Sequence, residues 1–196
     1  MKQVARSIKR ISDIGVSAAG LLLLSPLFLF LGLWVKASSK GPVFFIQERI
    51  GKDGVPFDLY KFRTMNIDAE KDGPQLSFKN DPRITKAGKF IRRYHLDELP
   101  QLWNVLKGEM SIVGPRPERE YYIKQIIKKE PRFRELQRIR PGVTSRGSVK
   151  YGYASSIDQM VQRGHFDLSY LDNMSITEDM KIIGATVRAV LAGKGI

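Results

Sequence analysis

Two adjacent carboxylates, Asp97 and Glu98, are the residues of this chain whose types and placement most directly suggest chemistry. They stand at the predicted start of a helix, where free amide groups and the positive end of the helix dipole favour a carboxylate and a phosphate. Asp97 equally suits a plain helix cap, because acidic residues are common at helix N-termini. Taken alone, the pair favours capping, so catalysis has to be argued from what surrounds it.

Five cationic residues from predicted loops, strand ends and helix ends accompany the pair: Lys61, Arg63, Arg92, Arg93 and Arg116. Arg116 stands between Pro115 and Pro117, so its backbone has little freedom and its guanidinium is suited to gripping phosphate. Each cation alone would be an ordinary surface charge. Together, a carboxylate among several cations suggests phosphoryl chemistry with Mg²⁺ as a shared counter-ion.

Other reactive residue types offer less. His95 is next to the pair, and we interpret it as a half-buried histidine that packs at the helix start rather than as a base. Ser25 lies in an apolar run with nothing nearby in the sequence to activate it as a nucleophile. The sequence contains no P-loop, no G-x-G-x-x-G and no metalloprotease motif.

Turn residues and hydrophobic periodicity predict the elements that must position the acidic pair. Beta-branched and aromatic residues around Gly51–Gly54 predict a β-hairpin over residues 42–65. The polar stretch 66–83 predicts a long, mobile loop. Basic amphipathic helices are expected over residues 85–96 and 118–129.

The C-terminal half is predicted to be mostly helical as well. Leu99, Leu102, Trp103 and Leu106 have helical spacing, with Pro100 in the first turn and Gly108 as the stop. Residues 114–117 predict a rigid loop and residues 140–147 a turn. Ser175 and Glu178 form a capping box that opens a last helix, with Gly193 past its end. The fold class expected is α+β, mostly helical with a small hairpin.

The composition points to an anionic partner. The chain has 33 Lys and Arg against 20 Asp and Glu, a net charge of +13, which suits nucleic acid, anionic lipid or a phosphorylated substrate. The absence of cysteine excludes a disulfide framework and a thiolate zinc site. Two histidines far apart, His95 and His165, argue against an all-histidine metal site.

The N-terminal run Ile14–Val35 is apolar and would span about 33 Å as a straight helix, the thickness of a hydrocarbon core. Pro26 predicts a kink there, and Ser25 can bond back to the carbonyls that the proline frees. Basic residues flank both ends, and such residues prefer the cytoplasmic side. A span and a re-entrant helix–break–helix are equally consistent with these residues. We expect an anchor over residues 1–40 and a catalytic domain over residues 41–196.

The chain resembles the bacterial sugar transferase family, the monotopic phosphoglycosyl transferases. The resemblance covers nearly the whole sequence and is most specific at "LDELPQLWNVLKGEMSIVGPRPE". Further matches are "KFRTM", "DPRIT", "FIRR", "RPGVTS" and "YLDNMSITEDMKII". The segment of several membrane helices that larger members carry ahead of this domain is not seen here, so the chain looks like the small, catalytic-core form.

The resemblance implies transfer of a phosphosugar from a UDP-sugar to polyprenyl phosphate, with release of UMP. It implies Asp97 as the nucleophile of a covalent phosphosugar intermediate, Glu98 as its partner, and Mg²⁺ as cofactor, for which both carboxylates are the expected ligands. The expected substrate-binding residues are Lys61, Arg63, Arg92, Pro115, Arg116 and Pro117. It also implies that the Ser25–Pro26 break dips into one leaflet of the bacterial inner membrane, among phospholipids, with the catalytic domain facing the cytoplasm.

Two other classes of function remain to be weighed. A membrane-tethered binding module could use the basic helix faces to hold anionic lipid or a partner. A nucleic-acid binder is suggested by the charge, but the sequence has no helix-turn-helix or aromatic-plus-basic RNA motif, so no nucleic-acid partner is expected. A homodimer is left open.

Overall fold

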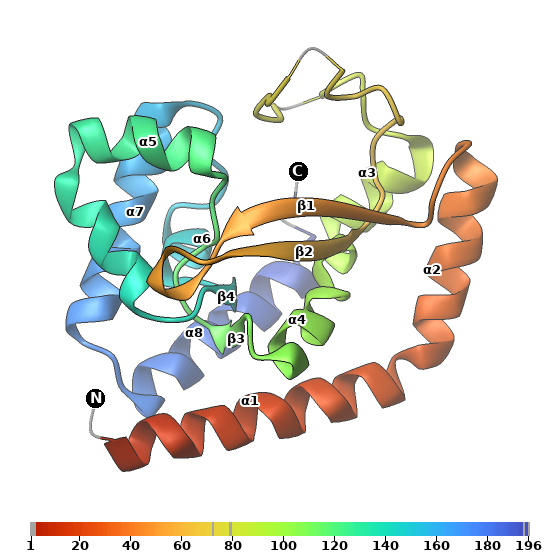
Figure 1. The fold of residues 1–196 in the computed structure, drawn as a ribbon. Helices are drawn as coiled ribbons and strands as arrows, with labels where there is room; N and C mark the ends of the chain where they lie inside the picture. The colour runs from red at the N-terminus through yellow and green to blue at the C-terminus, as the bar shows by residue number, and fades with distance from the viewer. Residues whose placement is uncertain (1–2, 72, 79, 194, 196) are drawn as a thin grey trace.

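The computed structural model describes residues 3–71, 73–78, 80–193 and 195. It is an α+β structure, mostly helical, with an antiparallel hairpin that crosses the middle of the molecule (Figure 1). The hairpin joins β1 (Phe44–Ile50) to β2 (Pro56–Phe62) through a short 3₁₀ turn, η1 (Lys52–Gly54), in the register Phe44 opposite Phe62. The predicted α+β class, mostly helical with a small hairpin, is therefore confirmed, and the predicted re-entrant anchor stays a prediction.

Helices and short strands surround the hairpin. In chain order they are α1 (Gln3–Leu23), α2 (Ser25–Ser38), α3 (Lys86–Arg93), η2 (Leu96–Glu98), α4 (Gln101–Lys107), β3 (Ser111–Val113), α5 (Glu120–Lys129), η3 (Pro131–Arg138), β4 (Gly142–Thr144), α6 (Arg146–Lys150), α7 (Ile157–Asp172) and α8 (Ile176–Leu191). Helices α5 and α7 flank one end of the hairpin, and α2 and α3 flank the other (Figure 1).

The predicted break at Pro26 is present. Helix α1 ends at Leu23 and α2 begins at Ser25, and the two helices are bent by 62°. The Ser25 hydroxyl donates a hydrogen bond of 2.8 Å to the Leu22 carbonyl, as expected for a serine beside a proline break. Among the described residues no single helix is long and apolar enough to cross a bilayer, whereas the bent pair reaches that length and apolarity together.

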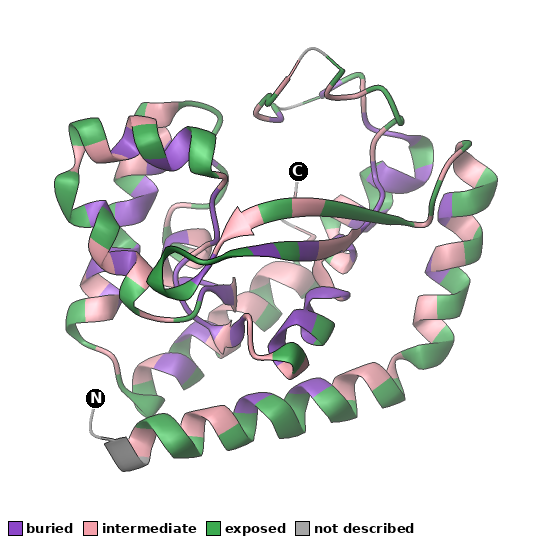
Figure 2. Ribbon diagram, viewed as in Figure 1, coloured by how far each residue is buried: buried purple, intermediate pink, exposed green. Residues whose placement is uncertain are grey.

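Exposed residues follow both helices of this pair (Figure 2), and most of the large ones among them are apolar. The most exposed large apolar side chains of the pair are Ile11, Val16, Leu22, Leu23, Leu29, Phe30 and Leu33. The inward face of α1 instead carries the buried Asp13, which accepts hydrogen bonds from the Ser111 hydroxyl at 2.7 Å and the Ile112 amide at 3.1 Å. The polarity of α1 is thus the reverse of that of a helix that faces water on its outer side.

Strand β2 connects two apolar clusters. Leu59 packs with Val105 and Met110 beneath the hairpin, and Phe62 packs against buried residues of α2 and α3. A third cluster joins α5, η3 and α7, where its buried members include Tyr122, Ile123, Ile126, Phe133, Leu136, Met160 and Leu168. These clusters hold the elements around the hairpin in fixed positions.

The prediction of a turn over residues 140–147 is wrong. Residues Gly142–Thr144 form β4, which pairs in parallel with β3, and α6 follows directly. The backbones approach so closely that a Cβ atom on Gly142 would lie 2.1 Å from the Gly114 nitrogen. The glycine that resembled a turn residue is needed for this close approach.

Helix α7 has no counterpart among the predicted elements. Its buried side includes Arg163, Gly164 and Asp167 beside Met160 and Leu168, so it lacks a continuous apolar stripe. The last helix, in contrast, begins as predicted, because the Ser175 hydroxyl accepts from the Glu178 amide and Gly193 follows its end with φ of 59°.

Loop 66–83 contains no helix or strand in its described part. Arg83 holds it together by donating to the Ala69 carbonyl at 3.0 Å, the Leu76 carbonyl at 3.1 Å and the Asp81 carboxylate. The loop prediction is confirmed as to structure, and its mobility stays a prediction.

Candidate active site

The acidic pair lies in η2, between α3 and α4. Asp97 is only 8% exposed, and α4 starts later, at Gln101, with no side-chain hydrogen bond at its N-cap. Asp97 therefore does not cap α4.

His95, just before the turn, is exposed and has a left-handed backbone with φ of 53°, so the prediction of a half-buried packing histidine is wrong. Its left-handed conformation lies between the end of α3 and the start of η2.

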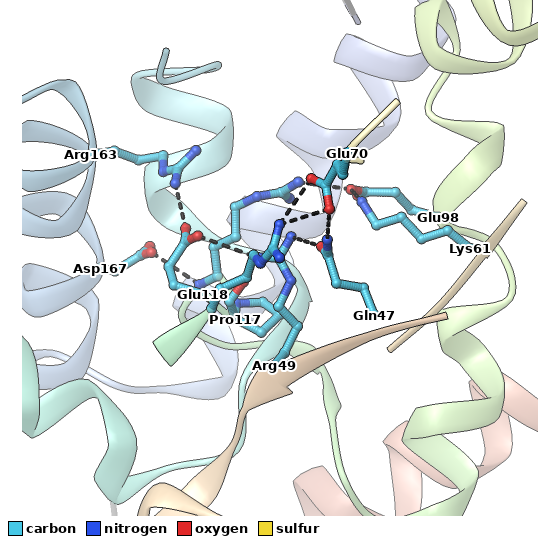
Figure 3. Close-up of polar contacts among 11 residues, drawn as sticks. Gln47, Arg49, Lys61, Glu70, Glu98, Pro117, Glu118, Arg163 and Asp167 are labelled. Atoms are coloured by element: carbon cyan, nitrogen blue, oxygen red, sulfur yellow. Dashed lines mark hydrogen bonds and ion pairs between the residues drawn. The ribbon is translucent and has the colours of Figure 1, made fainter. Parts of the chain in front are cut away.

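Glu98 and Asp97 have different surroundings. One Glu98 oxygen, Oε1, accepts from the Lys61 ammonium at 2.8 Å and from the Arg116 guanidinium at 2.9 Å (Figure 3). The Lys61 nitrogen lies 4.0 Å from Asp97 Oδ2, and no hydrogen bond to the Asp97 carboxylate occurs within the described part of the chain. Glu98 is thus neutralised by two cations, while Asp97 keeps its oxygens for a ligand.

The two pKa values are pushed apart. Burial raises the pKa of Asp97, the Lys61 charge lowers it, and the neighbouring Glu98 raises it again, so that it stays above its usual value. Burial would also raise the pKa of Glu98, but Arg116 and Lys61 outweigh burial and hold that pKa well below its usual range. Paired carboxylates with such different environments are suited to different roles in one reaction.

A cavity of about 260 Å³ opens beside Asp97. Its cationic lining residues are Arg49, Lys61, Arg63, Arg92, Arg116, Arg119 and Arg163. Its apolar lining residues include Phe44, Phe45, Met65 and Ile67. A cavity with this lining suits a ligand that joins a strongly anionic part to an apolar part.

The remaining predicted binding residues take different positions. Arg92 lines the cavity, and one of its terminal nitrogens is buried without a hydrogen-bond partner among the described residues. Arg63 also lines the cavity, but its guanidinium donates to the carbonyls of Ser39, at 2.8 Å, and Lys40. It therefore ties the end of α2 to the end of β2.

The two prolines and the break residues contribute indirectly. Pro115 and Pro117 line a second, smaller pocket and not the cavity of Asp97, as far as the described residues show. Their contribution is to fix the backbone of Arg116 between them. Ser25 and Pro26 belong to the bend between α1 and α2.

The sequence patterns missed a second polar group on the cavity wall (Figure 3). Glu118 accepts from Arg163 at 2.5 Å and from Arg49 at 3.3 Å. Glu70, from loop 66–83, accepts two hydrogen bonds of 2.9 Å from Arg119. Burial lowers the pKa of Arg49 to about 10, although Glu118 acts to raise it. In the sequence, only the position of Glu118 and Arg119 directly after Pro117 could have indicated this group. Arg163 gave no such indication, because it lies in a helix that was not predicted.

The described residues include no group of three or more histidine or acidic side chains that could hold a metal ion. Mg²⁺ commonly takes one or two protein carboxylates and fills its remaining positions with substrate phosphate oxygens and water. Asp97 and the second oxygen of Glu98 match that requirement, since neither has a hydrogen-bond partner in the part of the chain that the structure describes. The residues present therefore fit the predicted Mg²⁺ site.

Comparison with known proteins matches residues 4–193 to the family described as bacterial sugar transferase. The chain belongs to the bacterial sugar transferase family. The resemblance noted from the sequence motifs is thereby confirmed, over both the bent helix pair and the acidic cavity.

Several curated relatives of this bacterial sugar transferase are similar over most of the chain. It is 39% identical over 188 residues, 96% of its length, to the UDP-N-acetylgalactosamine-undecaprenyl-phosphate N-acetylgalactosaminephosphotransferase of Aeromonas hydrophila, of which the match covers 44%. It is 41% identical over 181 residues, 91% of its length, to the UDP-glucose:undecaprenyl-phosphate glucose-1-phosphate transferase of Klebsiella pneumoniae, of which 39% is covered. The chain thus spans about two fifths of these relatives. It is 39% identical over 199 residues to the exopolysaccharide production protein PSS of Rhizobium leguminosarum bv. phaseoli, covering 96% of this chain and 98% of that protein.

Proposed function

We propose that this sugar transferase moves a sugar 1-phosphate from a UDP-sugar to a polyprenyl phosphate such as undecaprenyl phosphate and releases UMP, in the first membrane step of polysaccharide or other glycoconjugate synthesis. The observation that carries this proposal is the buried carboxylate of Asp97, which accepts no hydrogen bond among the described residues and lies on the wall of a cationic cavity. The names of the relatives, which refer to UDP-sugars and undecaprenyl phosphate, support the choice of donor and acceptor.

The reaction has two steps at one phosphorus atom. An Asp97 oxygen attacks the phosphorus that bears the sugar, the bond to the bridging oxygen of the diphosphate breaks, and UMP leaves with that oxygen. A phosphate oxygen of the polyprenyl phosphate then attacks the same phosphorus. The bond to Asp97 breaks, and the lipid diphosphate sugar forms. A covalent route of this kind divides one difficult transfer into two easier ones at a single site.

The surrounding side chains supply positioning and charge neutralisation, which phosphoryl transfer needs more than a strong base. Lys61 and Arg116 are held by Glu98 at the cavity wall, where both can also meet phosphate oxygens. Arg92 lines the same wall, and one of its terminal nitrogens has no hydrogen-bond partner among the described residues. Arg63, Pro115 and Pro117 act by fixing the backbone around these groups. Asp97 and Glu98 are the ligands proposed for Mg²⁺, which would neutralise charge on the diphosphate.

We further propose that the bent helix pair is a re-entrant anchor in the bacterial inner membrane. The 62° bend and the exposed apolar side chains of both helices support this placement, and the basic flanks on both ends favour the cytoplasmic side. The cavity would then meet the lipid phosphate at headgroup height, with the soluble donor arriving from the cytoplasm. Loop 66–83, held to the cavity wall by Glu70, would close over the bound donor.

The activity is tested by incubating the protein with undecaprenyl phosphate, Mg²⁺ and a panel of UDP-sugars, and by measuring UMP. Without acceptor, mass spectrometry should find a phosphosugar adduct on Asp97. The matched control is Asp53→Asn, which changes an exposed aspartate of η1 and should keep both signals. If no UDP-sugar yields UMP while the protein still binds membranes, the tethered binding module becomes the better interpretation.

The anchor is tested by placing single cysteines at Ser7 and Lys40 in the cysteine-free chain. A membrane-impermeant maleimide should label both from the cytoplasmic side of inverted vesicles. Replacing Pro26 with alanine should straighten the pair and shift one site to the opposite side. Opposite-side labelling of the unaltered pair would reject the re-entrant placement.

A further inference from the structure

Helix α7 makes two hydrogen bonds to the loop that carries Arg116. Asp167 accepts a hydrogen bond from the Arg116 backbone N–H at 3.2 Å. Arg163, one turn earlier, donates to the Glu118 carboxylate at 2.5 Å. Figure 3 shows Arg163 and Asp167 reaching from one helix toward this loop. The backbone around Arg116 is therefore fixed by α7, whereas the acidic pair lies in η2.

Asp167 also joins a third segment. Its other oxygen accepts from the Gly147 N–H at 2.7 Å, in the first turn of α6. Only 3% of Asp167 is exposed, and no ion pair to its carboxylate is found in the described ranges of the chain. Burying a carboxylate without a paired cation is costly unless its hydrogen bonds compensate. The Ser145 hydroxyl and the nearby Arg163 charge also stabilise this carboxylate, and each of its two oxygens accepts from one backbone N–H group.

The sequence of the loop leaves few alternatives to the hydrogen bond between the Arg116 N–H and Asp167. Pro115 and Pro117 have no N–H, so Arg116 provides the only backbone donor among these three residues. The opposite side of the loop is fixed to the short parallel sheet, where Pro115 accepts from the Gly142 N–H at 2.9 Å. With both sides fixed, the direction in which the Arg116 side chain leaves the backbone is set, and it meets Glu98 at 2.9 Å.

We propose that Asp167 is a positioning residue for the transfer reaction: by accepting the single N–H of the Pro115–Pro117 loop, it holds the Arg116 guanidinium on Glu98 at the cavity wall. Within the described chain Asp167 does not line the cavity, so it acts through Arg116 and does not touch the substrate. The inference rests on the proposed function, because it assigns Asp167 a part in that reaction.

The test is a double-mutant cycle between Asp167→Asn and Arg116→Ala, read as UMP release from the donor that the full protein prefers. An asparagine keeps the size of the side chain but presents an NH₂ group to one of two N–H donors, so it cannot accept both. In the unaltered background kcat should fall roughly tenfold to hundredfold, since small displacements of a positioned group cost about that much. In the Arg116→Ala background the same substitution should cost less than about twofold, because coupled residues are not additive.

The matched control is Asp172→Asn, the same substitution on the exposed face of the same helix, where the aspartate pairs with Arg132. It should leave UMP release unchanged. Circular dichroism at the assay temperature confirms folding, and if the asparagine variant does not fold, Asp167→Ser carries the same cycle without the clash of two donors.

Two results would overturn the inference while leaving the proposed function intact. One is an Asp167→Asn protein with the unaltered kcat. The other is an equal loss in both backgrounds, which would make Asp167 a general stabilising residue that acts independently of Arg116. If the unaltered protein releases no UMP from any UDP-sugar, the proposed function itself fails, and the two failures are thus distinguished.

Discussion

Two glutamates of the cavity region, Glu98 and Glu118, have similar first contacts and different neighbours. Each accepts from two cations, Lys61 and Arg116 for Glu98, and Arg49 and Arg163 for Glu118. Beside Glu98, however, lies Asp97, a buried carboxylate with no hydrogen bond among the described residues. The paired glutamates alone would identify a polar core, whereas a neighbouring carboxylate with so few partners is the group we propose to meet a ligand.

The largest effect should come from removing that neighbour. Asp97→Asn should lower UMP release by about 10³-fold or more, because the nucleophile is lost. The same variant should melt at or above the temperature of the unaltered protein at pH 7.5. The raised pKa of Asp97 means that its ionised form is disfavoured by folding, so that stability falls as pH rises through that pKa, and asparagine removes this cost.

Thermal melting followed by circular dichroism, measured beside the UMP assay, checks this prediction. A large loss of stability together with the loss of activity would instead make Asp97 a structural residue.

Substitutions of the two glutamates should have similar effects on stability and different effects on activity. Glu98→Gln and Glu118→Gln should each cost about 1–3 kcal/mol of unfolding free energy at pH 7.5, because each leaves two cations without their charged partner. Glu98→Gln should also reduce UMP release about 10²-fold, whereas Glu118→Gln should reduce it less than about tenfold. Equal losses of activity in the two variants would contradict the inference that Glu98 belongs to the reacting site and Glu118 does not.

For Glu98 the pH dependence of stability has a definite sign. The pKa of Glu98 is lowered on folding, so its stabilisation is present above the unfolded pKa and is lost as pH falls. Urea unfolding at pH 7.5 and at pH 4 should therefore show the difference between Glu98→Gln and the unaltered protein shrinking in acid.

A smaller effect should follow from removing a cation that the two carboxylates share. Lys61→Met takes away the charge that acts to lower the pKa of Asp97. The nucleophile must be ionised, so the acid side of the profile of kcat/KM against pH should move to higher pH. The matched control is Lys52→Met, which removes an exposed lysine of the hairpin turn. An unmoved acid side would show that the ionisation of Asp97 does not limit the reaction.

Local signals were enough to predict several elements. The hairpin turn, the Pro26 break and the Ser175 capping box each depend on residues that are neighbours in sequence, so their geometry is dictated locally. The residues Asp97, Glu98, Lys61 and Arg116 were grouped from their types and sequence context, and the resemblance to the sugar transferases implied the roles of Asp97 and Glu98. The contacts that bring them together confirm that grouping, and their roles stay predictions.

What the sequence patterns missed depends on contacts between distant segments. Gly142 resembled a turn residue because its requirement for close approach comes from Gly114, 28 positions away in the numbering. Helix α7 hides its period because Arg163 and Asp167, which bind a loop, interrupt the apolar residues of its buried side. Such interruptions obscure the hydrophobic periodicity, and only the folded structure reveals them.

The hydrogen bonds of Arg63 join the bent helix pair to the rest of the protein. Because Arg63 binds the carbonyls of Ser39 and Lys40 to the end of β2, the hairpin and the bent helix pair cannot pivot freely about the segment that joins them. If the bent helix pair is the proposed anchor, this tie fixes the distance of the cavity from the membrane, and the phosphate of a lipid acceptor would have to reach that level to be used.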